Sequence, residues 1–308
     1  MHGHGVCVFG SLNIDLTVRL ARFHQPGETV VGQSFHTFTG GKGGNQAVAA
    51  ARLGGKVRMV ACLGADANGA LYRQALEREG VNAAHVAALP DETSGVALIE
   101  VDDAGENRIA IVAGANARLD AARAREAAEA IANCRCLLLQ LETPLEGVIE
   151  AARIAHEAGA TVILDPAPAR PLPDELLALC DYVTPNETEL ATLTGLPVDT
   201  DEQAEAACRR LLERGAGAAI NKRGAKGALL VTKDAVLPAP GFPVKAVDTT
   251  AAGDTFNAGF AVGLDSGLAV AEALRLANAA GALSTTALGA QPAMPTLDQA
   301  EGLLKTEN

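Results

Sequence analysis

Residues 247–256 read Val-Asp-Thr-Thr-Ala-Ala-Gly-Asp-Thr-Phe, a polar turn that runs into an apolar segment. From residue 251 to residue 264, Ala, Phe and Leu recur at helical spacing, which predicts a helix. The first amides of a helix have no partner within it, and the helix dipole adds partial positive charge at that end. Because Ala251, Ala252 and Gly253 are small, these amides stay open, and the stretch is a candidate anion-binding helix start.

Asp254 places a carboxylate in this candidate anion site, and two interpretations remain open. Asp is favoured in the first turn of any helix. Alternatively, Asp254 is a base aimed at a hydroxyl that attacks a phosphate held by the open amides. In either case the helix N-terminus predicts a lowered pKa for Asp254, which keeps the side chain ionised.

The composition excludes several classes of function. With 308 residues, 48% of them hydrophobic, the chain is long enough for one large domain or two ordinary ones. An aromatic content of 3% and a formal charge of -12 argue against a nucleic-acid-binding protein. We expect no secretory signal and no membrane span, because no apolar run has the required length or flanks. The six cysteines lack zinc spacing, so we expect buried thiols and a cytoplasmic protein without a structural metal.

Strand-like and helix-like segments alternate along most of the chain, which predicts a mostly parallel sheet covered by helices on both faces. Strands are predicted at residues 6–9, 57–62, 137–141, 162–164, 182–184, 218–220 and 229–232. Helices are predicted at residues 47–53, 67–79, 121–133, 145–157, 188–193, 202–214, 255–264 and 270–285.

One interval breaks this alternation. Two β-rich runs, 95–102 and 107–112, flank the turn Asp103-Ala104-Gly105 and predict a hairpin. Together with short strands in 16–39, the hairpin can form a small sheet outside the main one, such as a lid. Since no linker marks a boundary, we predict a single domain over residues 1–308, with a lid subdomain formed by about 16–39 and 93–112.

Polar residues follow two of the predicted strands. Gly10-Ser11-Leu12-Asn13-Ile14-Asp15 comes after strand 6–9, and Glu142 ends strand 137–141. Ligands of α/β sheets bind outside the carboxyl ends of the strands. Only one glycine follows the first strand, so the dinucleotide fingerprint is absent. Instead of serving a dinucleotide, Asn13 and Asp15 can form hydrogen bonds with hydroxyl groups of a ligand, or they can simply form Asx turns.

A glycine-rich stretch, Gly40-Gly41-Lys42-Gly43-Gly44-Asn45-Gln46, leads into the predicted helix at 47–53. It is not a Walker loop, because no Ser or Thr follows the lysine and the glycine spacing is wrong. Its backbone can approach a ligand closely while Lys42 and Asn45 supply donors. The alternative is a flexible turn before a helix.

Two further stretches carry polar residues at strand ends. In Asn186-Glu187-Thr188-Glu189, the first and last residues would lie close together in a first helical turn. They can serve a phosphate and a hydrated magnesium ion, or Asn186 can be a helix cap. A tight turn at Gly224-Ala225-Lys226-Gly227 follows Asn221, Lys222 and Arg223.

Together these stretches resemble the ribokinases, within the ribokinase-like carbohydrate kinases. The resemblance rests on residues 10–15, 40–50, 165–170, 184–189, 247–256 and 289–292. It implies a three-layer α/β/α sandwich with a mostly parallel central sheet and a small β-sheet lid that also pairs two subunits as a homodimer. It also implies transfer of the ATP γ-phosphate to the 5-hydroxyl of D-ribose, giving ribose 5-phosphate.

The resemblance implies roles for individual residues. In the catalytic group, Asp254 is the base and the anion hole consists of Ala251, Ala252 and Gly253. The implied sugar contacts are Asn13, Asp15, Gly41, Lys42, Gly43, Asn45 and Glu142. The implied nucleotide contacts are Asn186, Lys222, Arg223, Gly224, Ala225, Lys226, Gly227, Gly253 and Asn278. Mg²⁺ would be organised through water by Glu189. A potassium site that activates the family would comprise Asp248, Thr250, Ser284, Ala287, Gly289 and Ala293.

Three residues depart from the family pattern. Lys222 stands where members usually carry Thr, and its long cationic side chain can meet a phosphate or obstruct it. Ala293 replaces what is often a Ser hydroxyl, which would weaken potassium activation. Ala287 stands where a larger basic residue can occur, although a backbone carbonyl ligand would survive that change.

Other functions remain as alternatives at this stage. A nicotinamide oxidoreductase would use the same sheet but needs the missing glycine fingerprint. A non-catalytic sugar-binding regulator would keep Asn13, Asp15 and Lys42 without needing Asp254. Among kinases, deoxyribose, fructose or a nucleoside can replace ribose, because the lid selects the substrate. We expect no nucleic-acid or membrane partner.

Overall fold

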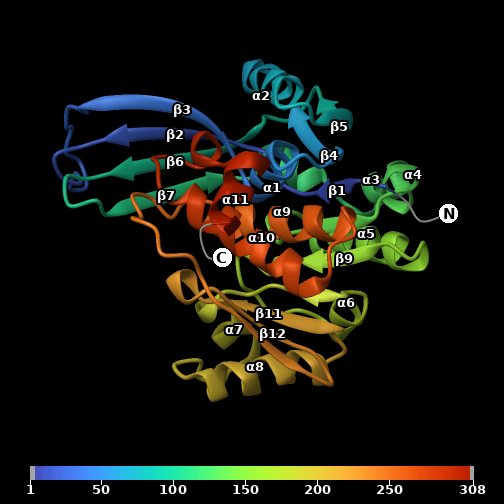
Figure 1. Cartoon of the computed structure of the whole chain (residues 1–308). Helices are drawn as coiled ribbons and strands as arrows, with labels where there is room; N and C mark the ends of the chain where they lie inside the picture. The colour runs from blue at the N-terminus through green and yellow to red at the C-terminus, as the bar shows by residue number, and fades with distance from the viewer. Residues whose placement is uncertain (1–3, 306–308) are drawn as a thin grey trace.

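The fold is built on a nine-stranded sheet with a separate four-stranded sheet beside it (Figure 1). The computed structural model describes residues 4–305, so the ends of the predicted domain, 1–3 and 306–308, lie outside the described residues. In spatial order the large sheet consists of β13 (Val236–Ala239), β12 (Ala228–Val231), β11 (Ala218–Lys222), β10 (Tyr182–Val183), β9 (Thr161–Leu164), β8 (Cys136–Leu139), β1 (Val6–Phe9), β4 (Val57–Gly64) and β5 (Asn82–Leu89). Its strands run parallel from β5 to β11, and β12 and β13 join antiparallel at one edge.

Both faces of this sheet are buried, as the apolar strand sequences predict. Along β1, Val6 and Val8 belong to one hydrophobic cluster, whereas Cys7 and Phe9 belong to the other. This alternation is expected of a strand with helices on both sides. One face is covered by α1 (Lys42–Arg52), α2 (Ala67–Arg78), α9 (Ala252–Asp265), α10 (Val270–Ser284) and α11 (Leu297–Lys305). The other is covered by α3 (Ala121–Glu126), α4 (Ala128–Ala132), α5 (Leu145–Glu157), α6 (Asp174–Ala178), α7 (Glu187–Thr194) and α8 (Asp201–Glu213). The predicted three-layer architecture is therefore confirmed.

The register of the parallel strands brings their carboxyl ends to one edge. Phe9 lies opposite Leu139, Leu139 opposite Leu164, and Leu164 opposite Val183. The residues that follow these four strands therefore emerge side by side. This is the crevice in which α/β sheets bind ligands.

The four-stranded sheet, here called the lid sheet, has the strand order β3 (Ser34–Gly40), β2 (Asn13–Arg19), β6 (Gly95–Val101) and β7 (Asn107–Val112). Strand β2 follows β1 after a short turn, so the lid sheet projects from the carboxyl edge of the main sheet (Figure 1, left). The predicted hairpin is present, since β6 and β7 pair antiparallel. Residues 29–31, which read as strand-like in the sequence, form no strand.

The structure corrects two predicted helices. The helix expected at 121–133 is broken at Ala127, which has a φ of -97° and a ψ of 12°, into α3 and α4. The helix expected from residue 47 begins at Lys42, so the glycine-rich stretch is its first turn and not a flexible loop. Strands β5 and β13 and helices α6 and α11 were not predicted from the sequence.

Two sequence expectations concern cysteines and membrane spans. All six cysteines are buried, and none forms a disulfide within the part of the chain that the structure describes. Among residues 4–305, no helix is long and apolar enough to span a bilayer.

Candidate active site

Helix α9 begins with open backbone donors at the carboxyl edge of the sheet. Its N-cap is Ala251, with a φ of 61° and a ψ of 13°, the one non-glycine residue with a positive φ among residues 4–305. Such strained conformations cluster at functional sites. The amide of Thr255 donates to the carbonyl of Ala251, whereas the amides of Gly253 and Asp254 have no backbone acceptor among the described residues. No side chain caps the helix, so these donors are available to an anion.

Asp254 lies in the first turn of α9 and is almost fully buried, with 5% of its surface exposed. Its two carboxylate oxygens accept hydrogen bonds from Asn45 Nδ2 at 3.0 Å and from Gln46 Nε2 at 3.1 Å. Burial raises the pKa of Asp254 to about 6, although the nearby Lys42 ammonium lowers it. The lowered pKa expected from the helix N-terminus is therefore wrong, because desolvation outweighs the helix dipole here.

Lys42 is the first residue of α1, and its positive charge lowers the pKa of Asp254. Burial alone would lower the pKa of Lys42, but the carboxylates of Asp254, Asp165 and Glu142 raise it above its ordinary value. Lys42 therefore stays charged in the site at any physiological pH. A permanent cation beside a carboxylate that titrates near neutrality is an arrangement suited to acid–base chemistry on a negatively charged substrate.

The glycines of α1 allow the helix start to lie against the turn after β1. A Cβ atom on Gly43 would lie 2.6 Å from both the carbonyl carbon of Gly10 and the amide of Ser11. Gly41, the N-cap of α1, has a φ of 82°, which side chains rarely tolerate. These two glycines fix Lys42 and Asn45 above the sheet edge, which explains why the glycine-rich stretch is helical.

Asn13, Asp15 and Glu142 are the three acidic or amide side chains that the sequence predicts as sugar contacts besides Asn45. Glu142 Oε2 accepts from the Lys42 amide at 3.0 Å and from the Ser11 hydroxyl. Burial, reinforced by the charge of Glu142, raises the pKa of Asp15 to about 7. The amide oxygen of Asn13 accepts from Asn116 Nδ2 at 2.8 Å. The Asn13 amide group donates no side-chain hydrogen bond among the described residues, so its donor is available to a ligand.

We predict that Asp15→Asn stabilises the protein at pH 8 and does so less as the pH falls. The pKa of Asp15 is about 7 in the folded chain, whereas the ordinary value for an aspartate, taken for the unfolded chain, is 3.8. The folded state therefore binds the proton more tightly, and Asp15 destabilises it at high pH by an amount that disappears as the pH falls towards 4. Urea unfolding at pH 8 and pH 4.5 measures this difference. Asp91→Asn, on an exposed turn, is the control; an equal effect of Asp15→Asn at both pH values would contradict the prediction.

A cavity of about 740 Å³ adjoins Asp254 and extends beneath α9 and α10. Its lining includes Lys42, Asp165, Asn186, Glu189, Lys222, Gly224, Ala225, Gly227, Ala251, Ala252, Gly253, Asp254 and Asn278. Lys42, Asn186 and Asp254 come from distant parts of the chain, so the crevice expected from the sequence is present. Its size is within the usual range for small-molecule sites.

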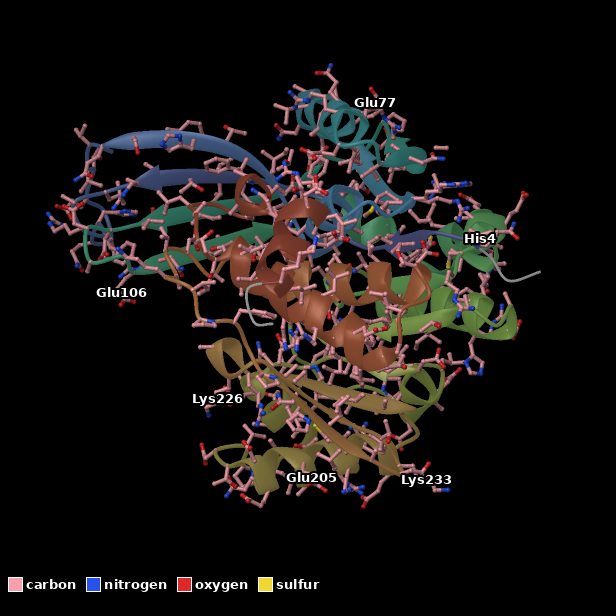
Figure 2. The ribbon with its side chains drawn as sticks, in the orientation of Figure 1. His4, Glu77, Glu106, Glu205, Lys226 and Lys233 are labelled. Carbon is pink, nitrogen blue, oxygen red and sulfur yellow. The ribbon has the colours of Figure 1, made fainter. Side chains whose placement is uncertain are left out.

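Not every residue expected at the nucleotide end faces this cavity. Arg223 is buried against α8, where its guanidinium contacts Asp201. Lys226 is exposed on the surface (Figure 2) and lies 3.8 Å from Glu187. Neither is among the lining residues. Asn186 and Glu189 line the cavity and also form a reciprocal capping box at the start of α7. The two interpretations of this pair are thus compatible.

The loops expected to hold a monovalent cation lie next to each other. Asp248 accepts from the amide and hydroxyl of Thr250 and from the amide of Gly289 at 2.9 Å. Although burial would raise the pKa of Asp248, these hydrogen bonds lower it overall. The Ser284 hydroxyl donates to the Gly281 carbonyl within α10. Oxygen ligands from this cluster suit a hard cation.

Several residues of the site carried no predicted role. Gln46 Nε2 lies 3.1 Å from both Asp254 Oδ1 and Asp165 Oδ2, so one amide group joins two carboxylates. Gln291 Nε2 donates to the hydroxyl of the buried Tyr72 at 3.1 Å, and that hydroxyl donates to the Gly40 carbonyl at 2.6 Å. Asp165 could have been found by the rule that selected Glu142, because it directly follows a buried strand. Tyr72 and Gln291 had no such signal.

Comparisons with known proteins place the chain in a family. The model of the pfkB family of carbohydrate kinases matches residues 4–297. A ribokinase of Haemophilus influenzae is 44% identical over 289 residues, covering 94% of both chains. A deoxyribokinase of Salmonella typhi is 40% identical over 295 residues, covering 96% of both chains. The solved structure of Arabidopsis thaliana ribokinase with ribose and ATP has a TM-score of 0.94, with 37% identity and 99% coverage of both chains.

Proposed function

Because this chain belongs to the pfkB family of carbohydrate kinases, we propose that it transfers the terminal phosphate of ATP to the 5-hydroxyl of D-ribose. The observation that carries the proposal is the position of Asp254. Its carboxylate lies beside two open amides at the start of α9 and borders both Lys42 and the cavity. A base, an anion site and a cation therefore meet at one point.

Asp254 would act as the base that removes the hydroxyl proton. A pKa of about 6 leaves most of the carboxylate ionised at pH 7 and still gives it useful basicity. Asn45 and Gln46 hold its two oxygens in place, so the remaining lone pairs face the site. The proton moves from the sugar hydroxyl to Asp254 as the oxygen attacks phosphorus, and ADP leaves.

The anion hole and the lysine would stabilise the charge on the transferred group. The amides of Gly253 and Asp254 point from a helix start, where the dipole favours negative charge. Lys42 offers a fixed cation near Asp254. Asp15, Asn13, Asn45 and Glu142, with the backbone of Gly41 and Gly43, would position the sugar, and the lid sheet would exclude water.

We also propose two ions and a set of nucleotide contacts. Mg²⁺ would neutralise phosphate charge, and Glu189 would hold it through water at the cavity wall. K⁺ would be held by Asp248 and Thr250 and by backbone oxygens near Ser284, Ala287, Gly289 and Ala293. The nucleotide would lie along Asn186, Lys222, Gly224, Ala225, Gly227 and Asn278; Arg223 and Lys226 would contribute only by shaping the turn.

One assay tests the proposed function. ATP consumption is followed with ribose, deoxyribose, fructose and a nucleoside, each with and without potassium. We expect the highest kcat/KM for ribose, with potassium increasing the rate. Deoxyribose is the second candidate, because a deoxyribokinase is 40% identical to this chain. If none of these acceptors supports ATP consumption, the proposal is overturned and a sugar-binding regulator is favoured.

The lid sheet would also pair two copies of the chain. It exposes large apolar side chains, with Ile109 at 54% and Ile111 at 58% of their surface. Ile109 and Ile111 are two residues apart on β7 and therefore share a face. A patch of this kind on a protein surface marks an interaction site. We also propose that the chain forms a single domain, of which the lid sheet is a subdomain.

We predict that Ile111→Lys converts the dimer to a monomer, because it buries an unpaired charge in the interface. Light scattering should give twice the chain mass of 31.4 kDa for the wild type and the single mass for the variant. Val236→Lys, on the edge strand β13 of the nine-stranded sheet, should remain dimeric. A monomeric wild type, or a dimeric Ile111→Lys, would contradict this assembly.

A further inference from the structure

Lys222 forms an ion pair inside the candidate active-site cavity. Its Nζ lies 2.8 Å from Asp165 Oδ1, and the two side chains are 11% and 3% exposed. They come from the carboxyl ends of β11 and β9, 57 residues apart in the chain. Replacing such a pair by apolar residues is often neutral for stability, because desolvation offsets the attraction. The fold therefore gains little from placing two charges here.

The position of Lys222 relative to α9 indicates a ligand. A Cβ atom built on Gly253 would lie 3.2 Å from Lys222 Nζ, so the ammonium group is next to the open amides at the helix start. Lys222 and Gly253 both line the cavity. An anion that binds these amides would thus contact the Lys222 ammonium as well.

Asp165 connects Lys222 to the proposed base. Its second oxygen accepts from Gln46 Nε2, which also donates to Asp254. The charge of Asp165 raises the pKa of Asp254, and the Lys222 ammonium lies directly on Asp165. Gln46 thus connects the Lys222–Asp165 ion pair to Asp254, whose carboxylate also feels the charge of Lys42. Lys222 cannot leave without uncovering the buried carboxylate of Asp165, so its ammonium group is held in place before any ligand arrives.

We infer that Lys222, held by Asp165, is a second cation for the terminal phosphate of the nucleoside triphosphate, and that it makes the site discriminate a triphosphate from a diphosphate. The inference rests on the proposed function in taking ATP as the phosphate donor. An ammonium next to the anion hole contacts only the phosphate that occupies that hole. A diphosphate, which ends one phosphate earlier, leaves Lys222 paired with Asp165 alone. The Thr usual in the family has no charge to offer there.

Direct binding tests the inference without relying on turnover. Titration calorimetry compares Mg-ADP with the non-hydrolysable β,γ-methylene analogue of ATP on the full chain. We expect Lys222→Met to lose at least about tenfold in affinity for the triphosphate analogue, the loss of one charge-assisted hydrogen bond, while its ADP affinity changes by less than about threefold. Lys222→Arg should restore most of the triphosphate affinity.

Two further variants keep the result interpretable. Lys233→Met removes one positive charge from an exposed turn of the same sheet and should leave both affinities unchanged. Lys233 is not among the residues that line the cavity, and Figure 2 shows it at the other end of the sheet from Lys226. Lys222→Met with Asp165→Asn removes both members of the pair, leaves no buried unpaired charge, and should show the same selective loss. Equal losses for both nucleotides, or tighter triphosphate binding by either Met variant, would overturn the inference and identify Lys222 as a structural or obstructing residue.

Failure of the proposed function would look different. If the wild type binds the triphosphate analogue selectively but phosphorylates no sugar, the sugar-kinase assignment is wrong and the role of Lys222 stands. If the wild type phosphorylates ribose and Lys222→Met retains triphosphate selectivity, the assignment stands and the role of Lys222 is wrong.

Discussion

Asp254→Asn should lower kcat at least about 100-fold while leaving ribose and ATP binding nearly unchanged. The amide is the same size as the carboxylate and cannot accept the proton of the attacking hydroxyl. In the wild type, Asp254 accepts from Asn45 and Gln46. Since the amide groups of both partners can flip, one of them can accept from the introduced amide, and the fold should survive.

The pH profile distinguishes a base from a merely structural carboxylate. A pKa of about 6 for Asp254 predicts that wild-type kcat falls as the pH drops through 6, because the protonated form cannot act as a base. The residual activity of Asp254→Asn should lack this limb. Asp298→Asn, at the exposed start of α11, is the matched control and should behave as wild type. Near-normal turnover in Asp254→Asn would remove Asp254 from the mechanism.

Lys42→Met should have the second-largest effect, a loss of about 100-fold or more in kcat/KM. This is the scale for removing one donor that stabilises transition-state charge. Met keeps the length and apolar stem of the side chain but removes the cation that faces Asp254. Lys42 also lowers the pKa of Asp254, which burial otherwise raises. Its removal should therefore shift the acid limb of the rate profile to higher pH.

The profile shift separates this role of Lys42 from simple sugar binding. As the pH is lowered, the residual activity of Lys42→Met should begin to fall at a higher pH than the activity of the wild type. Lys56→Met removes an exposed lysine that follows the same helix and should alter neither rate nor profile. A limb that stays in place, or moves to lower pH, would show that the Lys42 charge does not act on Asp254.

The architecture followed from local sequence patterns because the sheet is buried on both faces. Short apolar runs such as 6–9 are typical of strands buried on both faces, and this run forms the buried strand β1. The hairpin of β6 and β7 depends only on neighbouring residues and their turn. Strand β5 was missed because its Ala-rich sequence has only one β-branched residue, Val86, of the kind typical of strands. Strand β13 was missed because Pro238 argues against a strand, and an edge strand tolerates it.

The site was predictable in its motifs but not in its electrostatics. Asp254, Lys42 and Asn186 were found because each follows a recognisable turn at a strand or helix end. The pKa of Asp254 was wrong in direction, since burial depth depends on how α1 packs over α9 and not on the local helix start. The Lys222–Asp165 pair joins residues 57 positions apart, and no local pattern relates them. The start of α1 at Lys42 was missed because glycines disfavour helices unless close packing requires them.

The most direct test is to identify the product that the purified chain forms from ribose and Mg-ATP, by phosphorus-coupled NMR of the sugar. We expect one ADP per ribose phosphorylated, with phosphorus coupled to the protons of C5, and formation of this product at least about 100-fold more slowly by Asp254→Asn. Phosphate on another carbon, or product formed equally well without the Asp254 carboxylate, would contradict this expectation.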